Sequence, residues 1–181
     1  MKSRSHESRY LRQPKGITEQ NLLSSNVCSH SIEDLLHRIR RGLQKTYSNN
    51  ANDHAVKYAS TIAILQPLMD QYMENLSDHS LGLKHRKLLS EAFNDLAVSL
   101  AEKAWLESMP SLQLRARSYY LHSLRQHPTA LTARNLGRLL ESLEEWMELK
   151  GLMDWCLEKF TDSHYRSELL GMLKRATRKL R

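Results

Sequence analysis

The spacing of hydrophobic and polar positions over residues 111–143 predicts two helices joined by a short turn. One face of the first helix would be formed by Ala116, Tyr120 and Ser123. Pro128 follows where that helix must end, and Thr129 is suited to cap the next one. The second helix would present Leu131, Asn135, Leu136, Leu139, Leu140 and Leu143. Neither helix is long enough to be stable alone in water, so we expect both to pack against other helices, with a neighbouring backbone close to Gly137.

Similar periodicity continues on both sides of this hairpin. Further helices are expected over 31–47, 55–76, 84–106, 146–160 and 164–181. Ser31 is suited to cap the first of these helices, and Asp53 is suited to cap the second. Pro67 should kink or break the second helix, and Gly151 should divide the segment 146–160 into two.

Leu is far more frequent than Val and Ile, which favours an all-α fold built from antiparallel helical hairpins, about six to eight helices in total. A chain of 181 residues has room for one domain with a hydrophobic core. We expect a flexible basic arm over 1–30 and a single helical domain over 31–181. Within that domain, residues 84–160 would form a repeat-like core and 164–181 a basic terminal helix.

The helix before Pro128 resembles the second helix of a tetratricopeptide repeat, in which small and aromatic residues alternate at fixed spacing before a Pro. The residues that carry this resemblance are Ala116, Tyr120, Ser123 and Pro128, followed by the pair Leu136 and Gly137. The resemblance implies repeat-like helical packing and a non-catalytic role in binding another protein. The candidate contact residues on such a surface are Arg115, Arg117, Tyr119, Arg134 and Arg138.

The chain is also similar to the helical region that follows the catalytic domain in bacterial family 2 glycosyltransferases. The first part of this similarity comprises Tyr10, Arg12, Gln13, Pro14, Gly16, Thr18 and Asn21. The second comprises Ala116, Arg117, Tyr119, Leu121, Leu124 and Pro128. The resemblance implies a detached accessory module of a sugar-transferring system. The nucleotide-sugar domain itself is absent, so no catalytic residue can be assigned from this family.

Charge alternates along the chain, whose net charge is +7. Residues 1–50, 111–140 and 163–181 are basic, whereas 51–110 and 141–162 are acidic. Such blocks suit helices that pack side by side, but two basic ends could instead bind nucleic acid or an anionic membrane weakly. The candidate residues for that binding are Arg38, Arg40, Arg41, Lys174, Arg175, Arg178, Lys179 and Arg181. We expect those after residue 173 to face solvent.

Candidate chemistry is sparse. The nine His residues do not pair at metal-ligating spacing, and no phosphate loop or nucleophile motif occurs. Cys28 and Cys156 are expected to be free thiols, with Cys156 in the core rather than acting as a nucleophile. No apolar run has the length of a membrane span. We therefore expect a cytoplasmic protein with neither enzymatic activity nor a cofactor, which binds another protein. An accessory role beside a glycosyltransferase and a polyanion-binding role remain alternatives.

Overall fold

The computed structural model describes residues 25–49, 53–75 and 81–181, and this part of the chain folds into seven helices without a strand. The helices are α1 (Ser25–Ser48), α2 (His54–Asn75), α3 (Leu83–Glu107), α4 (Pro110–Gln126), α5 (Ala130–Ser142), α6 (Trp146–Lys159) and α7 (Arg166–Lys179). The predicted all-α fold is confirmed. Most of the predicted arm, residues 1–30, lies outside the described residues.

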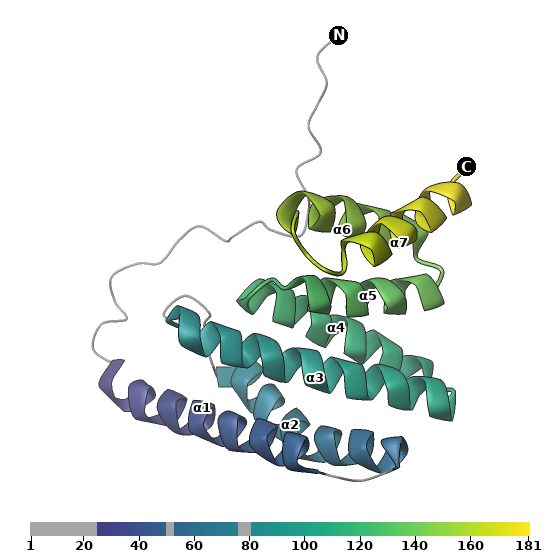
Figure 1. Ribbon diagram of the computed structural model, residues 1–181. Coiled ribbons are helices and arrows are strands. Elements are labelled where there is room, and N and C mark those ends of the chain that lie inside the picture. Colours follow the sequence, from purple (N-terminus) through teal and green to yellow (C-terminus); the bar gives the residue numbers. More distant parts are fainter. Residues whose placement is uncertain (1–24, 50–52, 76–80) are drawn as a thin grey trace.

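Consecutive helices run antiparallel and form a stack with α1 at one end and α7 at the other (Figure 1). Each helix packs against the next, and α1, α3, α5 and α7 also contact one another in succession. These odd-numbered helices therefore form one layer. In the described part of the chain α4 and α6, which belong to the other layer, do not pack extensively against each other. That separation leaves room for a groove between them.

The turns follow the local signals in the sequence. Asp53 accepts a hydrogen bond from the backbone N–H of Ala55 (2.8 Å), and Thr129 accepts one from Thr132 (3.1 Å), so both predicted caps are confirmed. Between α3 and α4, Ser108 takes a left-handed conformation (φ 54°) and Pro110 occupies the start of α4. These two positions separate α3 from α4 sharply.

Three predicted boundaries are wrong. The first helix begins at Ser25, so Ser31 lies inside α1 rather than capping it. A break at Pro67 is absent, because α2 continues through this residue, which lies on an exposed face where water can reach the carbonyl that loses its helical partner. Gly151 lies inside α6, which continues unbroken from Trp146 to Lys159, so the predicted division of this segment is absent.

The core runs continuously through the stack and is centred on Phe93 of α3. The Phe93 ring packs edge-on against Tyr72 of α2 (centroids 5.9 Å apart) and stacks on Tyr119 of α4 (6.0 Å). Tyr120 is 2% exposed, as expected from the helical spacing of the hairpin. Leu131 was expected on the apolar face of α5 but is exposed, and Thr132 and Ala133 are buried in its place.

Candidate interaction surface

Cys156 is fully buried in α6, and this burial raises the pKa of its thiol to about 12. The group therefore stays protonated at neutral pH and packs as a core residue, as predicted. The side chain of Cys28 lies outside the described residues. Among the residues that the structure describes, no three His, Cys, Asp or Glu side chains lie together as a metal site would require.

An apolar groove lies between α4 and α6, with α5 at its floor. We call it the α4/α6 groove, and it is lined by Leu121, Leu124, Leu136, Leu140, Leu152 and Trp155. Its enclosed volume is about 70 Å³, and the volume is about 690 Å³ when the open solvent at its mouth is counted. The floor residues are almost fully buried, whereas the walls on α4 and α6 are only half-buried. The groove therefore offers apolar side chains that another molecule could cover.

Gly151 adds no side chain to the wall that α6 forms along the α4/α6 groove. It lies in the middle of α6 and is exposed, and a Cβ atom added there would meet nothing within 4 Å. A side chain at this position would project into open space, although Gly weakens a helix interior by roughly 0.5–1 kcal/mol relative to Ala. Packing within the protein thus gives no reason for Gly151.

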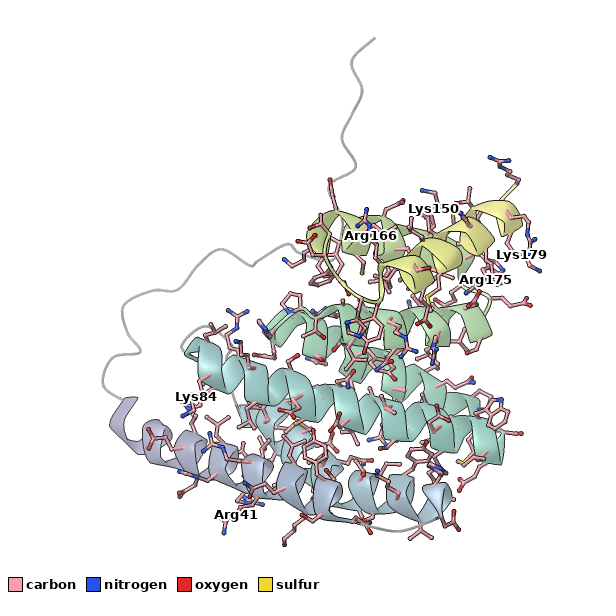
Figure 2. The ribbon with its side chains drawn as sticks, in the orientation of Figure 1. Arg41, Lys84, Lys150, Arg166, Arg175 and Lys179 are labelled. Carbon is pink, nitrogen blue, oxygen red and sulfur yellow. The ribbon has the colours of Figure 1, made fainter. Side chains whose placement is uncertain are left out.

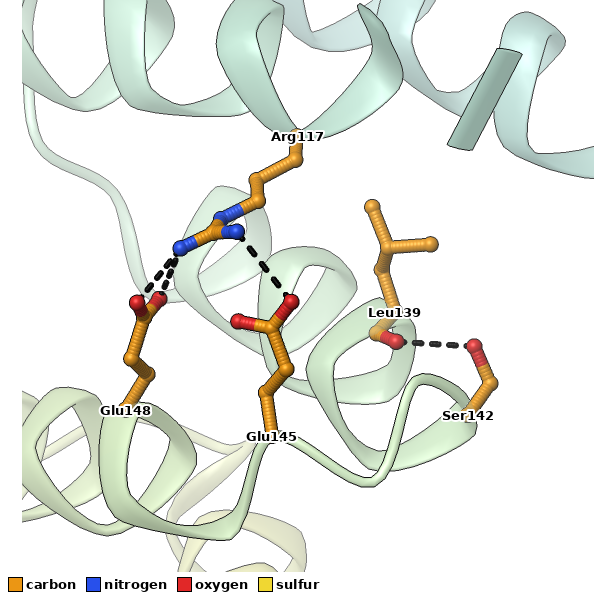
Figure 3. Close-up of polar contacts among 5 residues, drawn as sticks. All are labelled: Arg117, Leu139, Ser142, Glu145 and Glu148. Atoms are coloured by element: carbon orange, nitrogen blue, oxygen red, sulfur yellow. Dashed lines mark hydrogen bonds and ion pairs between the residues drawn. The ribbon is translucent and has the colours of Figure 1, made fainter. Parts of the chain in front are cut away.

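Arg117 lines one end of the α4/α6 groove, and Figure 3 shows its contacts with Glu145 and Glu148. Its guanidinium donates to the Glu145 carboxylate (3.1 Å) and to both carboxylate oxygens of Glu148. The Ser142 hydroxyl donates to the carbonyl of Leu139 (2.7 Å) in the last turn of α5, just before the loop that carries Glu145. The charge of Arg117 is therefore balanced within the chain, and this ion pair holds α6 beside α4.

The five predicted partner-contact residues do not form one surface. Tyr119 is 4% exposed and its hydroxyl donates to Asp70, so its placement on a binding surface is wrong. Burial, and then the hydrogen bond to Asp70, raises the pKa of Tyr119 to about 12. Arg115 lies 3.9 Å from the same Asp70 carboxylate. On this side α4 packs against α3 and contacts Asp70 of α2, which the local spacing could not reveal.

Arg134 and Arg138, the other two predicted contact residues, both donate to the carboxylate of Glu168 on α7. Arg134 also lies over the Tyr165 ring, 5.1 Å from its centroid. Burial acts to raise the pKa of Glu168, but the hydrogen bonds from these two Arg side chains outweigh it and lower that pKa. Both Arg residues thus help to fasten α7 to α5, and only Arg138 remains largely exposed.

The eight predicted polyanion-contact residues lie at the two ends of the stack, as Figure 2 shows for Arg41 on α1 and for Arg175 and Lys179 on α7. Two of the C-terminal residues are engaged rather than free for solvent. Arg175 donates to Glu141 (Nη2 to Oε2, 2.9 Å), and the Lys179 ammonium lies 5.4 Å from the centroid of the Trp146 ring. On α1, Arg38 donates to Gln71 (3.1 Å).

The remaining positions of this set differ in exposure. Arg40 is half-buried, whereas the others are exposed and form no ion pair within the described part of the chain: Arg41, Lys174, Arg178 and Arg181. The unpaired charge at the C-terminal end is therefore smaller than the sequence suggested.

Sequence reasoning missed a basic cluster at the end of the α4/α6 groove opposite Arg117. We define the basic cluster as Arg86, Lys87, Arg125, His127 and Lys159. Arg125 lines the groove, and Arg86 donates to its carbonyl oxygen (3.1 Å). Partial burial, followed by the positive charges of Lys87, Arg86 and Lys159, lowers the pKa of His127. These residues come from three helices and from the turn after α4, so only the run 84–87 signals the cluster locally.

A second hollow, larger but more open to solvent, lies on other faces of α4 and α5, beside α3. Its lining includes Trp105, which is 74% exposed, together with Tyr120, Asn135 and Arg138. Leu106, Met109 and Leu114 are also exposed near the turn from α3 to α4. This surface is apolar in part, but it lacks the continuous leucine lining of the α4/α6 groove.

Comparisons with protein-family models, with curated proteins and with solved structures found no match to this chain. No helix in the described ranges is both long and apolar enough to cross a membrane.

Proposed function

We propose that this chain is a non-catalytic α-helical module with repeat-like packing, and that it binds another protein through the α4/α6 groove. The observation that carries the proposal is an open groove lined by five leucines and a tryptophan. The wall residues on α4 and α6 are partly exposed, and this forgoes about 25 cal/mol for each Å² of apolar surface that could be buried. A partner that covers them recovers that energy, which is the usual basis of helix-in-groove recognition.

The test compares two glycine substitutions on neighbouring helices. Gly151→Leu adds a side chain into the α4/α6 groove, where a Cβ has no neighbour. Gly171→Leu adds the same atoms to α7, where the closest atom to the new Cβ is a terminal nitrogen of Arg175 at 3.4 Å. With the full chain as bait, partners identified by mass spectrometry should be retained by Gly171→Leu and lost by Gly151→Leu. Equal retention by both variants would contradict the proposal.

A polyanion-binding role has one observation in its favour, the exposed and unpaired charges of Lys174, Arg178 and Arg181. Binding of that kind would be non-specific, with a dissociation constant of roughly 10⁻⁴–10⁻⁶ M at physiological salt. It would weaken steeply as salt rises, because each neutralised phosphate releases condensed counterions. Replacing these three residues by Gln should abolish it. Partners held by the α4/α6 groove should be much less sensitive to salt. An accessory role beside a glycosyltransferase remains a prediction from the sequence.

A further inference from the structure

The two ends of the α4/α6 groove differ in their charge balance. At one end Arg117 is neutralised by Glu145 and Glu148. At the other end Arg125 is exposed and has no carboxylate partner among the described residues. The Lys159 ammonium lies over Trp155, 5.6 Å from the ring centroid, at the same end. The groove is therefore apolar along its length and positive at one end only.

The remaining members of the basic cluster extend this positive end. Arg86 is held against Arg125 by its hydrogen bond to the Arg125 carbonyl, and Lys87 is exposed beside it in the sequence. Glu158 and Asp162, the carboxylates that flank Lys159 in the sequence, are exposed and form no ion pair within the described part of the chain. The structure thus leaves several cations close together with no carboxylate in ion-pair contact among the described residues, which opposes folding slightly and favours an anionic ligand.

We infer that the α4/α6 groove takes an amphipathic helical segment of a partner protein whose carboxylates lie against the basic cluster. This inference rests on the proposed function and names the partner's chemistry. Arg117, Leu121 and Leu124 recur on one face of α4. From Arg117 to Arg125 this face extends about 12 Å, because a helix rises 1.5 Å per residue. That length matches about two turns of a bound helix, so the partner supplies apolar side chains at about i, i+4 and i+7.

Charge argues against two other occupants. The N-terminal segment of this chain is itself basic over residues 2–15, so the basic cluster would repel it. Nucleic acid would satisfy the cations but would leave the leucines of the α4/α6 groove uncovered, because the phosphate backbone dominates its non-specific affinity. An acidic amphipathic helix satisfies both parts of the surface at once.

Three fluorescein-labelled synthetic peptides of about 14 residues, the length of roughly four helical turns, test the inference by fluorescence anisotropy with the full chain. The first has Leu at i, i+4 and i+7 and Glu residues at one end. The second replaces those Glu residues by Lys, and the third replaces the Leu residues by Ser. The first peptide should bind at least about tenfold more tightly than either of the others, a difference of about 1.4 kcal/mol.

Two variants locate the binding. Arg125→Glu with Lys159→Glu should remove the preference for the acidic peptide and favour the Lys peptide, because both replaced side chains are exposed and lie at the positive end of the groove. Lys174→Glu with Arg178→Glu makes the same charge change on α7, away from the α4/α6 groove, and should leave the preference intact. Gly151→Leu should weaken binding of the acidic peptide at least about tenfold.

Each contrary outcome has a distinct meaning. Equal affinity for the acidic and Lys peptides, still blocked by Gly151→Leu, overturns the acidic partner but leaves the proposed function standing. Absence of binding, or binding unaffected by Gly151→Leu, overturns both. A dimer in sedimentation that Gly151→Leu dissociates assigns the groove to a second copy and overturns the inference. The double variant Leu22→Ser with Leu23→Ser tests the chain's own N-terminal residues as the occupant. If it raises peptide affinity about tenfold, those residues occupy the α4/α6 groove and the inference is overturned.

Discussion

The α6 helix contributes side chains to two regions, and they are buried in one region and partly exposed in the other. Towards α5 and α7 it forms a closed seam, which we define as Gly137, Leu149, Met153, Leu169 and Met172, all buried. A Cβ added at Gly137 would lie only 2.9 Å from both Met153 Cε and Met172 Sδ. Towards α4 the same helix forms one wall of the open α4/α6 groove, where Gly151 meets nothing. Gly137 and Gly151 both lie in helix interiors, but only at Gly137 does close packing require a residue without a side chain.

The difference shows which apolar surface the fold uses. In the closed seam Gly137 lets the two Met side chains reach α5, and the lost backbone stability is offset by close packing. In the α4/α6 groove no contact within the chain offsets the backbone stability lost at Gly151. Apolar residues that stabilise the fold are thus separated, within one helix, from apolar residues that remain available for binding.

The largest expected difference in stability is between Ala substitutions at two adjacent residues of α6. Met153 is fully buried in the closed seam, whereas Leu152 lines the α4/α6 groove and is half-buried. Met153→Ala should lower the free energy of unfolding by about 2–5 kcal/mol, because it leaves a cavity in a packed core. Leu152→Ala should cost about 1 kcal/mol or less, since its surface is already partly hydrated. Urea denaturation measures both, and similar losses for the two variants would abolish the distinction between the regions.

Replacing either glycine by Ala should change the free energy of unfolding by a smaller amount, and the change should have opposite signs in the two regions. Gly151→Ala should stabilise the chain by roughly 0.5–1 kcal/mol, because Ala is the better helix former and its methyl group meets no neighbour. Gly137→Ala gains the same propensity but forces Met153 and Met172 to shift. Overpacking of this kind costs about 1–3 kcal/mol, although flexible Met termini keep it near the lower limit. We expect a net loss of about 1 kcal/mol by thermal or urea unfolding, and stabilisation by both variants would show that the seam is loose.

The sequence was sufficient to predict features set by local physics. Thr129 and Asp53 cap helices because their oxygens accept from nearby backbone N–H groups, and this needs only a few residues of context. Pro110 shows what the local spacing left out, because it occupies the first position of α4, where its missing N–H needs no helical partner. The amount of helix follows from the leucine spacing, which fixes the apolar faces that must be buried.

Other features depend on neighbours that are distant in the sequence. Tyr119 and Tyr120 are adjacent, and the helical spacing assigned only Tyr120 to the core, yet both are buried because α4 is covered on two sides. Gly151 resembles a helix break, but Leu149 and Met153 hold the helix in place from the closed seam. The basic cluster assembles Arg86, Arg125 and Lys159 from three helices, and the local run 84–87 contains only part of it.

The smallest effect concerns the polar edge of the closed seam, where Glu168 of α7 accepts hydrogen bonds from Arg134 and Arg138 of α5. These bonds lower the pKa of Glu168 in the folded chain despite the opposing effect of burial. A carboxyl with a lowered folded-state pKa stabilises the fold fully above its ordinary pKa, and this contribution is lost as pH falls through the lowered value. Glu168→Gln should therefore cost about 0.5–1 kcal/mol near pH 7, because the pair is partly exposed.

Near pH 3 the stability difference between the wild-type chain and Glu168→Gln should shrink, because an increasing fraction of Glu168 is then protonated and a protonated carboxyl resembles the amide of Gln. Urea unfolding of both proteins at the two pH values measures the change, and taking the difference cancels the titration of every other group. Asp162→Asn is the matched control, since Asp162 is exposed and forms no ion pair among the described residues. Its stability difference should stay near zero at both pH values. A Glu168→Gln difference that is unchanged at low pH would mean that the two Arg bonds contribute nothing through charge.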